Sequence, residues 1–492
     1  MNYDTKRGAE IYRRSMTVLL QCAISELFPD LKVQIGQSLM NGYYFEIPLD
    51  KRLPVNFVQE VTRRIRQIVE KDEKFIKKTV LKSYAIRLYK AKGRDDKARS
   101  VSYLKYKRIN LIFLRDYFDF NLTECVVSTR YLPTFKIIMY KCGFILQFPV
   151  YGNKNSLPVN VDRQEKLYKV HIEAKNWNGI LGIQHVSDLN KAIKDGNIST
   201  IIKVQEAFHE KKIAYIADKI KSQFPKKRLI FAAGPSASGK TTFLKRLGIQ
   251  IRANGLIPEE ISLDNYFVSR SKTPKMSNGK CDYECLEALD LVLFKQHIIA
   301  LMNGKEVILP KFSFKTGRRH NSDKKLRLLD NSVILIEGIH GLNPSLLPAI
   351  DNASKYKIFV SALTQLCIDS DTRIFTSDSR LMRRIIRDYL FRGYSAKQTI
   401  SRFPKVRQGE DRYIFPYQDN ADVFFNSSII YEQSILKSFI EKLLRNINKN
   451  EEEYYEARRI LNYLNFFHSI SPGEVPQTSI LREFIGESCF NY

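Results

Sequence analysis

The second half of the sequence predicts an α/β fold with a mostly parallel sheet, and the first half predicts an α+β domain. From about residue 226, short apolar runs alternate with amphipathic helical stretches. Continuous apolar strands between helices are typical of a parallel sheet that helices cover on both faces. A glycine-rich phosphate-binding motif follows the first run directly. The runs expected to form strands are RLIFAAG, EEISLDNYF, VILIEGIHG, YKIFVSA and ADVFFNSSI.

The first 200 residues mix helical and strand patterns. Residues 8–27 carry apolar side chains at helical spacing, and 56–77 and 78–92 are expected to form two further helices. Residues 135–151 alternate in character, which predicts a hairpin with Gly143 near its turn.

A chain of 492 residues is too long for one ordinary hydrophobic core, so several regions are expected. Residues 1–200 are predicted to form the α+β domain, and 201–225 a helical linker at the end of a helical stretch over 188–222. Residues 226–446 are predicted to form the α/β domain. Residues 447–492 are predicted to form a helical tail.

The composition restricts the class of protein. The net charge of +28 suits nucleic acid, anionic membranes or phosphorylated ligands. Because the basic clusters are short and scattered, a dispersed basic surface with nucleotides as the bound polyanions is the favoured interpretation. The seven Cys form no C-x-x-C pair, which argues against a disulfide framework and a zinc site. With neither a signal peptide nor an apolar run of membrane-spanning length, the chain is expected to be cytoplasmic, with no membrane partner.

The strongest chemical signal is GPSASGKT at residues 234–241, a full G-x-x-x-x-G-K-[ST] (Walker A) motif. It lies between the predicted strand LIFAA and the predicted helix TTFLKRLGIQIRA, which is the context that this motif requires. Backbone N–H groups and the helix N-terminus attract phosphate oxygens. Lys240 is expected to hold the β- and γ-phosphates, and Thr241 to ligate Mg²⁺. The residues expected to bind ATP are Gly234, Ser236, Ala237, Ser238, Gly239, Lys240, Thr241 and Thr242.

Two carboxylates follow later strands of the predicted sheet. Asp264 ends the second strand, where ligands bind in open α/β sheets, and it could accept a hydroxyl proton or hold Mg²⁺ through water. A helix N-cap is the alternative role for this Asp. Glu337 ends the strand VILIE and stands where a Walker B motif usually has Asp, which suits outer-shell coordination of Mg²⁺.

A stripe of arginines follows on a predicted helix. Arg380, Arg383, Arg384 and Arg387 stand at i, i+3, i+4 and i+7, so they share one face. Such a face could neutralise charge on a transferring phosphoryl group when a lid over 376–394 closes. The alternative is a solvated arginine face.

Taken in order, these elements resemble the uridine kinase and phosphoribulokinase family of P-loop kinases. The resemblance covers about 226–430 and rests on GPSASGKT, SLDNYF, DYECLEALD, EGIHG and the R-L-x-R-R-x-x-R-D helix. It implies ATP-dependent transfer of the γ-phosphoryl group to a small hydroxyl compound, above all to the 5′-hydroxyl of a nucleoside. It also implies that Asp264 is the general base and an acid linked to Mg²⁺, with Lys240 as a catalytic partner and Glu337 on the metal side. The positions on the family's nucleoside contacts are Tyr266, Tyr283 and Glu284, and those on its catalytic lid arginines are Arg380 and Arg383.

The segment from Phe312 to Arg318 departs from the family. Pyrimidine kinases of this family have Tyr-Asp-Phe and then His along the base, whereas Gly317 occupies the aligned His position here. This departure leaves the identity of the acceptor open. A sugar phosphate or a vitamin precursor is the alternative, and a basic acceptor site formed by Lys315, Arg318 and Arg319 would favour it.

The front half resembles the editing-type domain of threonyl-tRNA synthetase, shared with alanyl enzymes. The matching pieces are AEIYRRSMTVLLQCAISELFPD, QIGQSLMNGYYFEIP and YFDFNLTECVVSTRYLP, within about 9–150. Active members carry His-x-x-x-His and Cys-x-x-x-His pairs, which align with Arg14, Val18, Asn121 and Cys125. Hydrolytic editing is therefore not expected, and binding, regulation or oligomerisation is the expected role.

A second hypothesis belongs to a different class. The synthetase-like front and the basic charge would also suit an RNA-binding, translation-linked regulator that uses ATP as a switch. RNA is the less favoured partner, and a homo-oligomer is compatible with the sequence.

Overall fold

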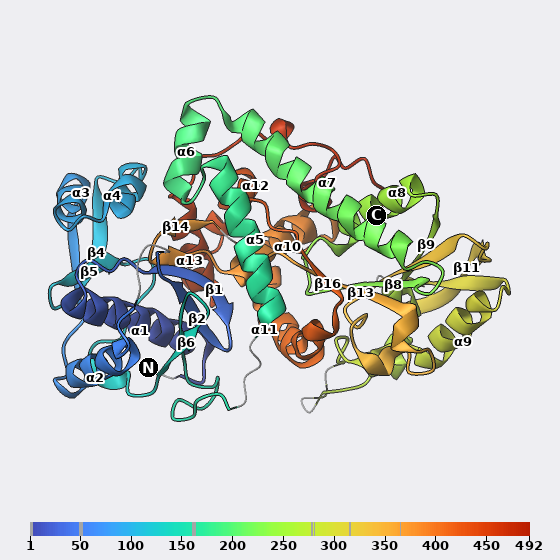
Figure 1. Cartoon of the computed structure of the whole chain (residues 1–492), viewed down its shortest axis with the longest axis horizontal. Coiled ribbons are helices and arrows are strands. Elements are labelled where there is room, and N and C mark those ends of the chain that lie inside the picture. Colours follow the sequence, from blue (N-terminus) through green and yellow to red (C-terminus); the bar gives the residue numbers. More distant parts are fainter. Residues whose placement is uncertain are drawn as a thin grey trace. The chain divides into compact units, whose positions relative to one another are not determined.

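The computed structural model describes residues 3–492 except 49–52, 160–163, 277–278, 280, 314–315 and 365. The chain forms two compact units (Figure 1). The units interleave along the chain, whereas the sequence pattern predicts consecutive regions. Unit 1 consists of Met1–Ile198, Thr364–Phe375 and Tyr454–Ser469, and unit 2 of Ser199–Leu363, Thr376–Glu453 and Ile470–Tyr492.

Unit 2 is built on a five-stranded parallel sheet, as the apolar runs predict. The strand order is β16-β13-β8-β12-β9, and each neighbouring pair is parallel. Because helices cover both faces, β8 and β13 are buried at every position. The strands are β8 (Leu229–Ala233), β9 (Ile257–Ser262), β12 (Ser332–Glu337), β13 (Lys355–Ser361) and β16 (Val423–Asn426).

Alternate side chains of this sheet face two different cores, as the two-residue period of a strand requires. Ile230 and Ala232 of β8 pack with α7 and α8, whereas Leu229 and Phe231 pack with α9 and the β10–β11 hairpin. Helices therefore lie on both faces of the sheet (Figure 1). The elements are α7 (Ile198–Ser222), α8 (Lys240–Ala253), α9 (Leu291–Met302), β10 (Val307–Ser313) and β11 (Arg318–Leu326).

Three further helices of unit 2 follow β13 and carry the charged side chains of the candidate site. Helix α11 begins with a capping box, in which Ser395 accepts from the N–H of Gln398 and the Gln398 side chain accepts in return. None of the helices in the described part of the chain combines the length and apolar character that a bilayer crossing requires. The helices are α10 (Thr376–Phe391), α11 (Ala396–Tyr413) and α12 (Glu432–Arg445), with the short α14 (Arg482–Ile485) near the C-terminus.

Unit 1 contains two antiparallel sheets with strand orders β1-β2-β7-β6 and β3-β4-β5. The hairpin predicted over 135–151 is confirmed: β6 and β7 pair from Tyr140 opposite Gly143 to Lys136 opposite Gln147. The strands are β1 (Gln34–Leu39), β2 (Gly42–Glu46), β3 (Ile76–Leu81), β4 (Arg108–Leu114), β5 (Tyr117–Phe120), β6 (Lys136–Tyr140) and β7 (Gly143–Gln147), with the short β14 (Cys367–Asp369) and β15 (Thr372–Arg373).

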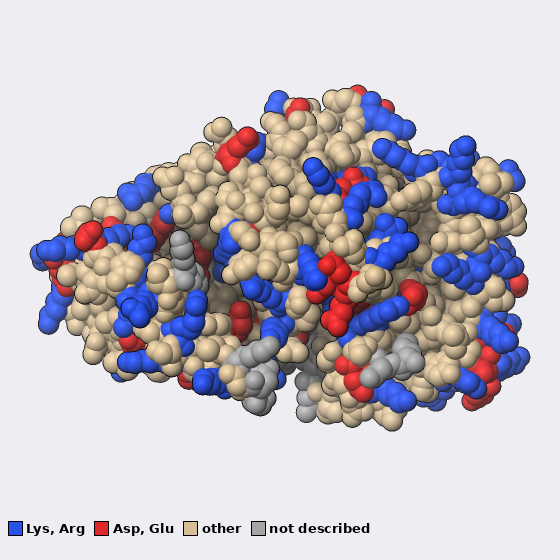
Figure 2. Space-filling model, turned by 180° about the vertical axis from the view of Figure 1, so that it is seen from behind, with Lys and Arg blue, Asp and Glu red and all other residues tan. Residues whose placement is uncertain are grey.

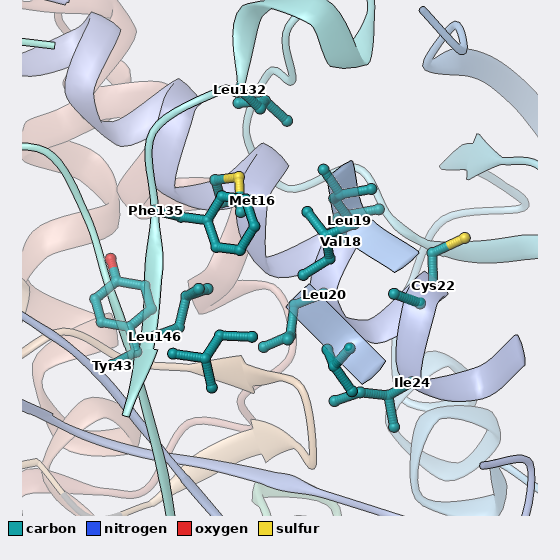
Figure 3. Close-up of a cluster of buried hydrophobic side chains, with 14 of the residues drawn as sticks. Met16, Val18, Leu19, Leu20, Cys22, Ile24, Tyr43, Leu132, Phe135 and Leu146 are labelled. Atoms are coloured by element: carbon teal, nitrogen blue, oxygen red, sulfur yellow. The ribbon is translucent and has the colours of Figure 1, made fainter. Parts of the chain in front are cut away.

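Helix α1 (Lys6–Leu27) forms the centre of the unit 1 core, which confirms the helix predicted over 8–27. Its N-cap Thr5 accepts from the N–H of Gly8 at 3.0 Å. The helix is buried continuously from Ser15 to Ile24. Figure 3 shows its side chains meeting Tyr43 and Leu146 of the four-stranded sheet. The other helices are α2 (Phe57–Glu70), α3 (Lys82–Ala91), α4 (Asp95–Ser102), α5 (Glu165–Leu181), α6 (Val186–Lys194) and α13 (Tyr454–Leu464).

The helix predicted over 56–77 is wrong in its last turns. Helix α2 ends at Glu70, and Asp72 adopts a positive φ of 52°, which a helix cannot continue through. Residues 76–81 then form β3, which pairs along its whole length with β4. Pairing with a distant strand therefore overrides the local helical pattern, and the next helix begins at Lys82 instead of 78.

A buried charge cluster ties Thr364–Phe375 into unit 1. The Lys97 ammonium, 1% exposed, lies 2.6 Å from Asp119, 2.8 Å from Asp369 and 3.2 Å from Asp371. Burial alone would lower the pKa of Lys97, but these carboxylates raise it overall. The cluster therefore holds Lys97 charged inside the core and fixes the segment just before α10.

We expect Lys97→Met to destabilise unit 1 by about 3 to 5 kcal/mol, because it leaves buried carboxylates without their shared cation. Trp177, the single Trp of the chain, lies on α5 of unit 1, so its fluorescence during urea unfolding reports on this unit. The exposed Lys105→Met is the matched control and should leave the midpoint unchanged. Equal midpoints for both variants would contradict the prediction.

Candidate active site

The phosphate-binding motif joins β8 to α8, as predicted. Gly239, the N-cap of α8, has φ +80°, and Ala237 has φ +57°. A Cβ on Gly234 would overlap the carbonyl oxygen of Val360, so only glycine fits there. The Lys240 ammonium donates to the loop carbonyls of Gly234 at 3.0 Å and Pro235 at 3.2 Å.

Two acids meet Lys240 at the carboxyl edge of the sheet. Glu337 ends β12, and its partner in β9 is Ser262, which lies two residues before Asp264. The Thr241 hydroxyl donates to Glu337 at 3.0 Å. Adjacent parallel strands thus bring the residues that the sequence separates by more than 70 positions to one edge.

Burial dominates the ionisation of these groups. It raises the pKa of Glu337 to about 7 and raises the pKa of Asp264, and the Lys240 charge opposes both shifts. Burial lowers the pKa of Lys240, whereas Glu337 and Asp264 raise it. More carboxylates than ammonium groups are crowded here, which is an arrangement that favours binding of a further cation.

The two arginines predicted for the lid are buried in ion pairs. Arg380 donates to Glu410 of α11 at 2.7 Å and to the carbonyl of Ser236 at 3.1 Å. Arg383 donates to Glu432 of α12 at 2.6 and 2.7 Å. Both arginine side chains are 0% exposed. The structure thus places them as braces between α10 and its neighbours.

Other arginines on and after α10 act on the acids of the site. Arg384 donates to the hydroxyl of Ser236 at 2.6 Å. Arg387 and Arg392 both lower the pKa of Asp264, against the larger effect of burial. Burial and the nearby Arg392 lower the pKa of Arg387 to about 10. The helical stripe contained Arg384 and Arg387, but nothing in the sequence showed which of its members pair with internal acids.

The predicted acceptor residues are spread over different surroundings. Tyr266 is 1% exposed in the core beside α9, where its hydroxyl lies 3.0 Å from His297 Nδ1. Tyr283 is 42% exposed. Burial raises the pKa of Glu284 to about 7, and the charge of Arg384 opposes this rise. The charge of Arg384, whose side chain donates to Ser236 of the phosphate loop, thus also acts on Glu284.

The segment that departs from the family is partly described. Phe314 and Lys315 lie outside the described residues. Arg318 is exposed at the start of β11. Gly317 has φ +66°, and a Cβ there would come within 2.8 Å of the Arg270 side chain. Glycine at the aligned His position therefore follows from the backbone of this turn.

In unit 1, one of the positions aligned with the synthetase pairs, Arg14, forms an ion pair with Asp119. Arg14 donates to Asp119 at 2.8 Å and to the carbonyl of Phe120 at 2.7 Å. The Arg14 guanidinium also opposes the rise that burial causes in the pKa of the Cys125 thiol. A search of the described residues finds no group of three or more His, Cys, Asp or Glu side chains placed to hold a metal ion.

Residues 229–430 match the phosphoribulokinase / uridine kinase family. A uridine kinase of Tolumonas auensis is 30% identical over 227 residues, which cover 44% of this chain and 95% of that protein. The chain belongs to the phosphoribulokinase / uridine kinase family. It is therefore a P-loop kinase that uses ATP and acts on a small molecule.

Two other similarities were found, one to a tRNA ligase and one to a solved structure. A threonine–tRNA ligase of Stenotrophomonas maltophilia is 27% identical over 134 residues, 27% of this chain, and the match spans only 21% of the ligase. The structure of a possible uridine kinase from Bacillus stearothermophilus covers 44% of this chain and 98% of its own, with 17% identity and a TM-score of 0.31. The ligase similarity confirms the synthetase-like front region that the sequence indicates.

Arg383→Met and Arg384→Met should separate structural support from catalysis. Removal of Arg383 leaves the buried Glu432 unpaired, so we expect a loss of about 3 to 5 kcal/mol in unfolding free energy. Arg384→Met should change stability by at most about 1 kcal/mol but lower phosphoryl transfer about a hundred-fold. Thermal unfolding and initial rates check both. Early melting of the Arg384 variant, or a stable but inactive Arg383 variant, would reverse the assignment.

Proposed function

We propose that this kinase transfers the γ-phosphoryl group of Mg²⁺-bound ATP to a hydroxyl group of a nucleoside, with the 5′-hydroxyl as the acceptor and uridine or cytidine as the first candidates. The observation that carries this proposal is the position of Asp264, just after β9, with Lys240 and Glu337 at the carboxyl edge of the sheet. The uridine kinases among the relatives support a nucleoside as the acceptor.

The P-loop supplies the phosphate contacts. Residues 234–242 present N–H groups at the start of α8, and the N-terminus of a helix attracts anions. Lys240 now bonds to its own loop carbonyls, and its ammonium would turn to the β- and γ-phosphates.

The oxygen donors around Lys240 suit a magnesium ion. Thr241, Asp264 and Glu337 offer a hydroxyl and two carboxylates, and Mg²⁺ is usually held by one or two carboxylates, with phosphates and waters as its other ligands. Two carboxylates with raised pKa values beside one ammonium group fit a site completed by a divalent cation. When bound, this ion would neutralise charge on the phosphates.

Asp264 has the properties of a general base. Its raised pKa makes it a better proton acceptor than an Asp of ordinary pKa, while Lys240, Arg392 and Arg387 oppose that rise. It would accept the proton of the attacking hydroxyl. The arginines after Arg383 would stabilise the negative charge as the phosphoryl group moves.

The acceptor side is the least determined part of the proposal. Tyr283 and Glu284 are the candidates for nucleoside contact, and Glu284 with its raised pKa could donate or accept a hydrogen bond near neutral pH. Arg319 is engaged with Asp290 at 2.9 Å, which leaves the exposed Arg318 as the described basic group of the sugar-phosphate alternative.

The test is ATP turnover against nucleosides, sugar phosphates and vitamin precursors. We expect one nucleoside to raise turnover in the wild type, and Lys240→Ala and Asp264→Asn to lower it about a thousand-fold without unfolding the chain. Asp323→Asn, an exposed Asp on β11, is the matched control and should retain full activity. Turnover with a sugar phosphate alone would replace the nucleoside by that acceptor. Full activity of the Asp264 variant would exclude it as the base.

A basic surface of unit 1 favours RNA binding as a second function. Residues 71–108 contain fourteen Lys and Arg against four Asp and Glu. Lys77 and Lys78 are exposed on β3, an edge strand, and Tyr84 and Tyr106 are exposed nearby in the sequence. Figure 2, which views the molecule from behind, shows Lys and Arg side chains gathered at the end of unit 1 that carries α3 and α4. Exposed cations with interspersed aromatic rings suit a phosphate backbone and unpaired bases.

If this surface binds RNA, Lys77→Glu with Lys78→Glu should weaken binding of a single-stranded RNA at least ten-fold and flatten its salt dependence. Lys305→Glu with Lys324→Glu makes the same charge change on exposed positions of unit 2 and should leave affinity unchanged. Filter binding at several salt concentrations distinguishes the two. Equal losses in both double variants would indicate attraction by net charge alone.

A further inference from the structure

The C-terminal segment of unit 2, Ile470–Tyr492, packs on the phosphate loop. Ile480 and Phe484 belong to the same core as Phe243 of α8. Ile480 lies so close to Gly239 that a Cβ on this glycine would overlap it. The segment is thus part of the wall of the nucleotide site.

A carboxylate of this segment occupies donors of the phosphate loop. Glu483 accepts from the backbone N–H of Thr242 at 3.2 Å and from its hydroxyl at 2.9 Å. Thr242 is the third residue of α8, so its N–H is one of the helix donors without an intrahelical partner. The Tyr492 hydroxyl lies 2.8 Å from the same threonine hydroxyl. An anionic oxygen therefore already sits where such a helix end binds phosphate.

The same carboxylate faces the arginine helix. Glu483 lies 3.7 Å from Arg387, and the two side chains are 9% and 15% exposed. The ring of the next residue, Phe484, lies under Arg387 and Arg383, at 5.9 and 5.1 Å from their guanidinium carbons. One residue of the tail thus engages both the phosphate loop and an arginine that acts on Asp264.

A second carboxylate, Glu410, also accepts from an N–H group of the phosphate loop, and its contacts are tighter than those of Glu483. Glu410 accepts from the N–H of Ser236 at 3.0 Å, is 1% exposed and pairs with both Arg380 and Arg407. Glu483 has one arginine, at a longer distance, and greater exposure.

Glu483 also adds a negative charge to a site that already contains two acids. It raises the pKa of Glu337 and of Lys240, so it forms a third acid around a single lysine. A polyphosphate that entered the same space would repel this carboxylate and compete for the Thr242 donors.

We propose that Glu483 is an internal placeholder for a nucleotide phosphate, which ATP must displace. Displacement frees Arg387 to face the phosphates, so the C-terminal segment couples occupation of the loop to the arginine helix. This inference rests on the proposed nucleotide site around Lys240.

Direct ATP binding to the full-length chain, by calorimetry without acceptor, tests the placeholder. We expect Glu483→Gln to bind ATP about ten-fold more tightly than wild type, because a neutral amide competes less with phosphate. Glu487→Gln is the matched control on the same segment: Glu487 pairs with Arg482 at 2.8 Å, is 79% exposed, and should not alter affinity.

Two comparisons distinguish an incorrect nucleotide site from an incorrect role of Glu483. Lys240→Ala should weaken ATP binding; if it does not, the nucleotide site itself is misplaced. If Lys240→Ala weakens binding while Glu483→Gln leaves it unchanged or weakens it, the placeholder is overturned and Glu483 instead supports the loop. Hydrogen exchange gives a second readout: saturating ATP should increase exchange in 479–487 of the wild type, and increased protection there would contradict displacement.

Discussion

The ion pairs of α10 are the interactions on which the rest of the site depends. Arg380 joins Glu410 to the carbonyl of Ser236, and Arg383 joins Glu432 to the loop before α12. Removing one partner of such a pair strongly lowers the free energy of unfolding, because the remaining charge is buried without a partner and without solvation by water. The phosphate loop is therefore held by charges inside the protein, and its geometry does not depend on the nucleotide alone.

The sequence predicted the elements whose signal is local or whose period is unambiguous. Continuous apolar runs identified the five strands of the sheet, and the glycine and lysine pattern identified the P-loop. The helix over 71–77 failed because Ile76–Leu81 pairs with a strand about 30 residues away. The roles within the arginine stripe were hidden for a similar reason: the acids that neutralise Arg380 and Arg383 lie 30 and 49 positions downstream.

Unit 1 contains a buried charge cluster that includes one of the positions aligned with the synthetase pairs. The sequence resemblance aligns Arg14 with a histidine of the synthetase family, and the Arg14 guanidinium pairs with Asp119, which also accepts from Lys97. Arg14, which also donates to the carbonyl of Phe120, thus helps to neutralise the Asp119 carboxylate. The same cluster holds Asp369. Asp369 lies seven residues before α10, so only a short stretch of chain separates this cluster from the arginines of α10.

Charge balance at the sheet edge connects these observations. Asp264, Glu337 and Glu483 surround Lys240. Burial raises the pKa of Asp264 and raises that of Glu337 to about 7, so protons and cations compete for Glu337 near neutral pH. A free nucleotide would add negative charge to this cluster, whereas a metal-bound nucleotide would add less. At the nucleotide site that we propose, the acids would therefore favour the metal complex over free ATP. In the displacement that we propose, Arg387 pairs with Glu483 until a phosphate replaces this carboxylate.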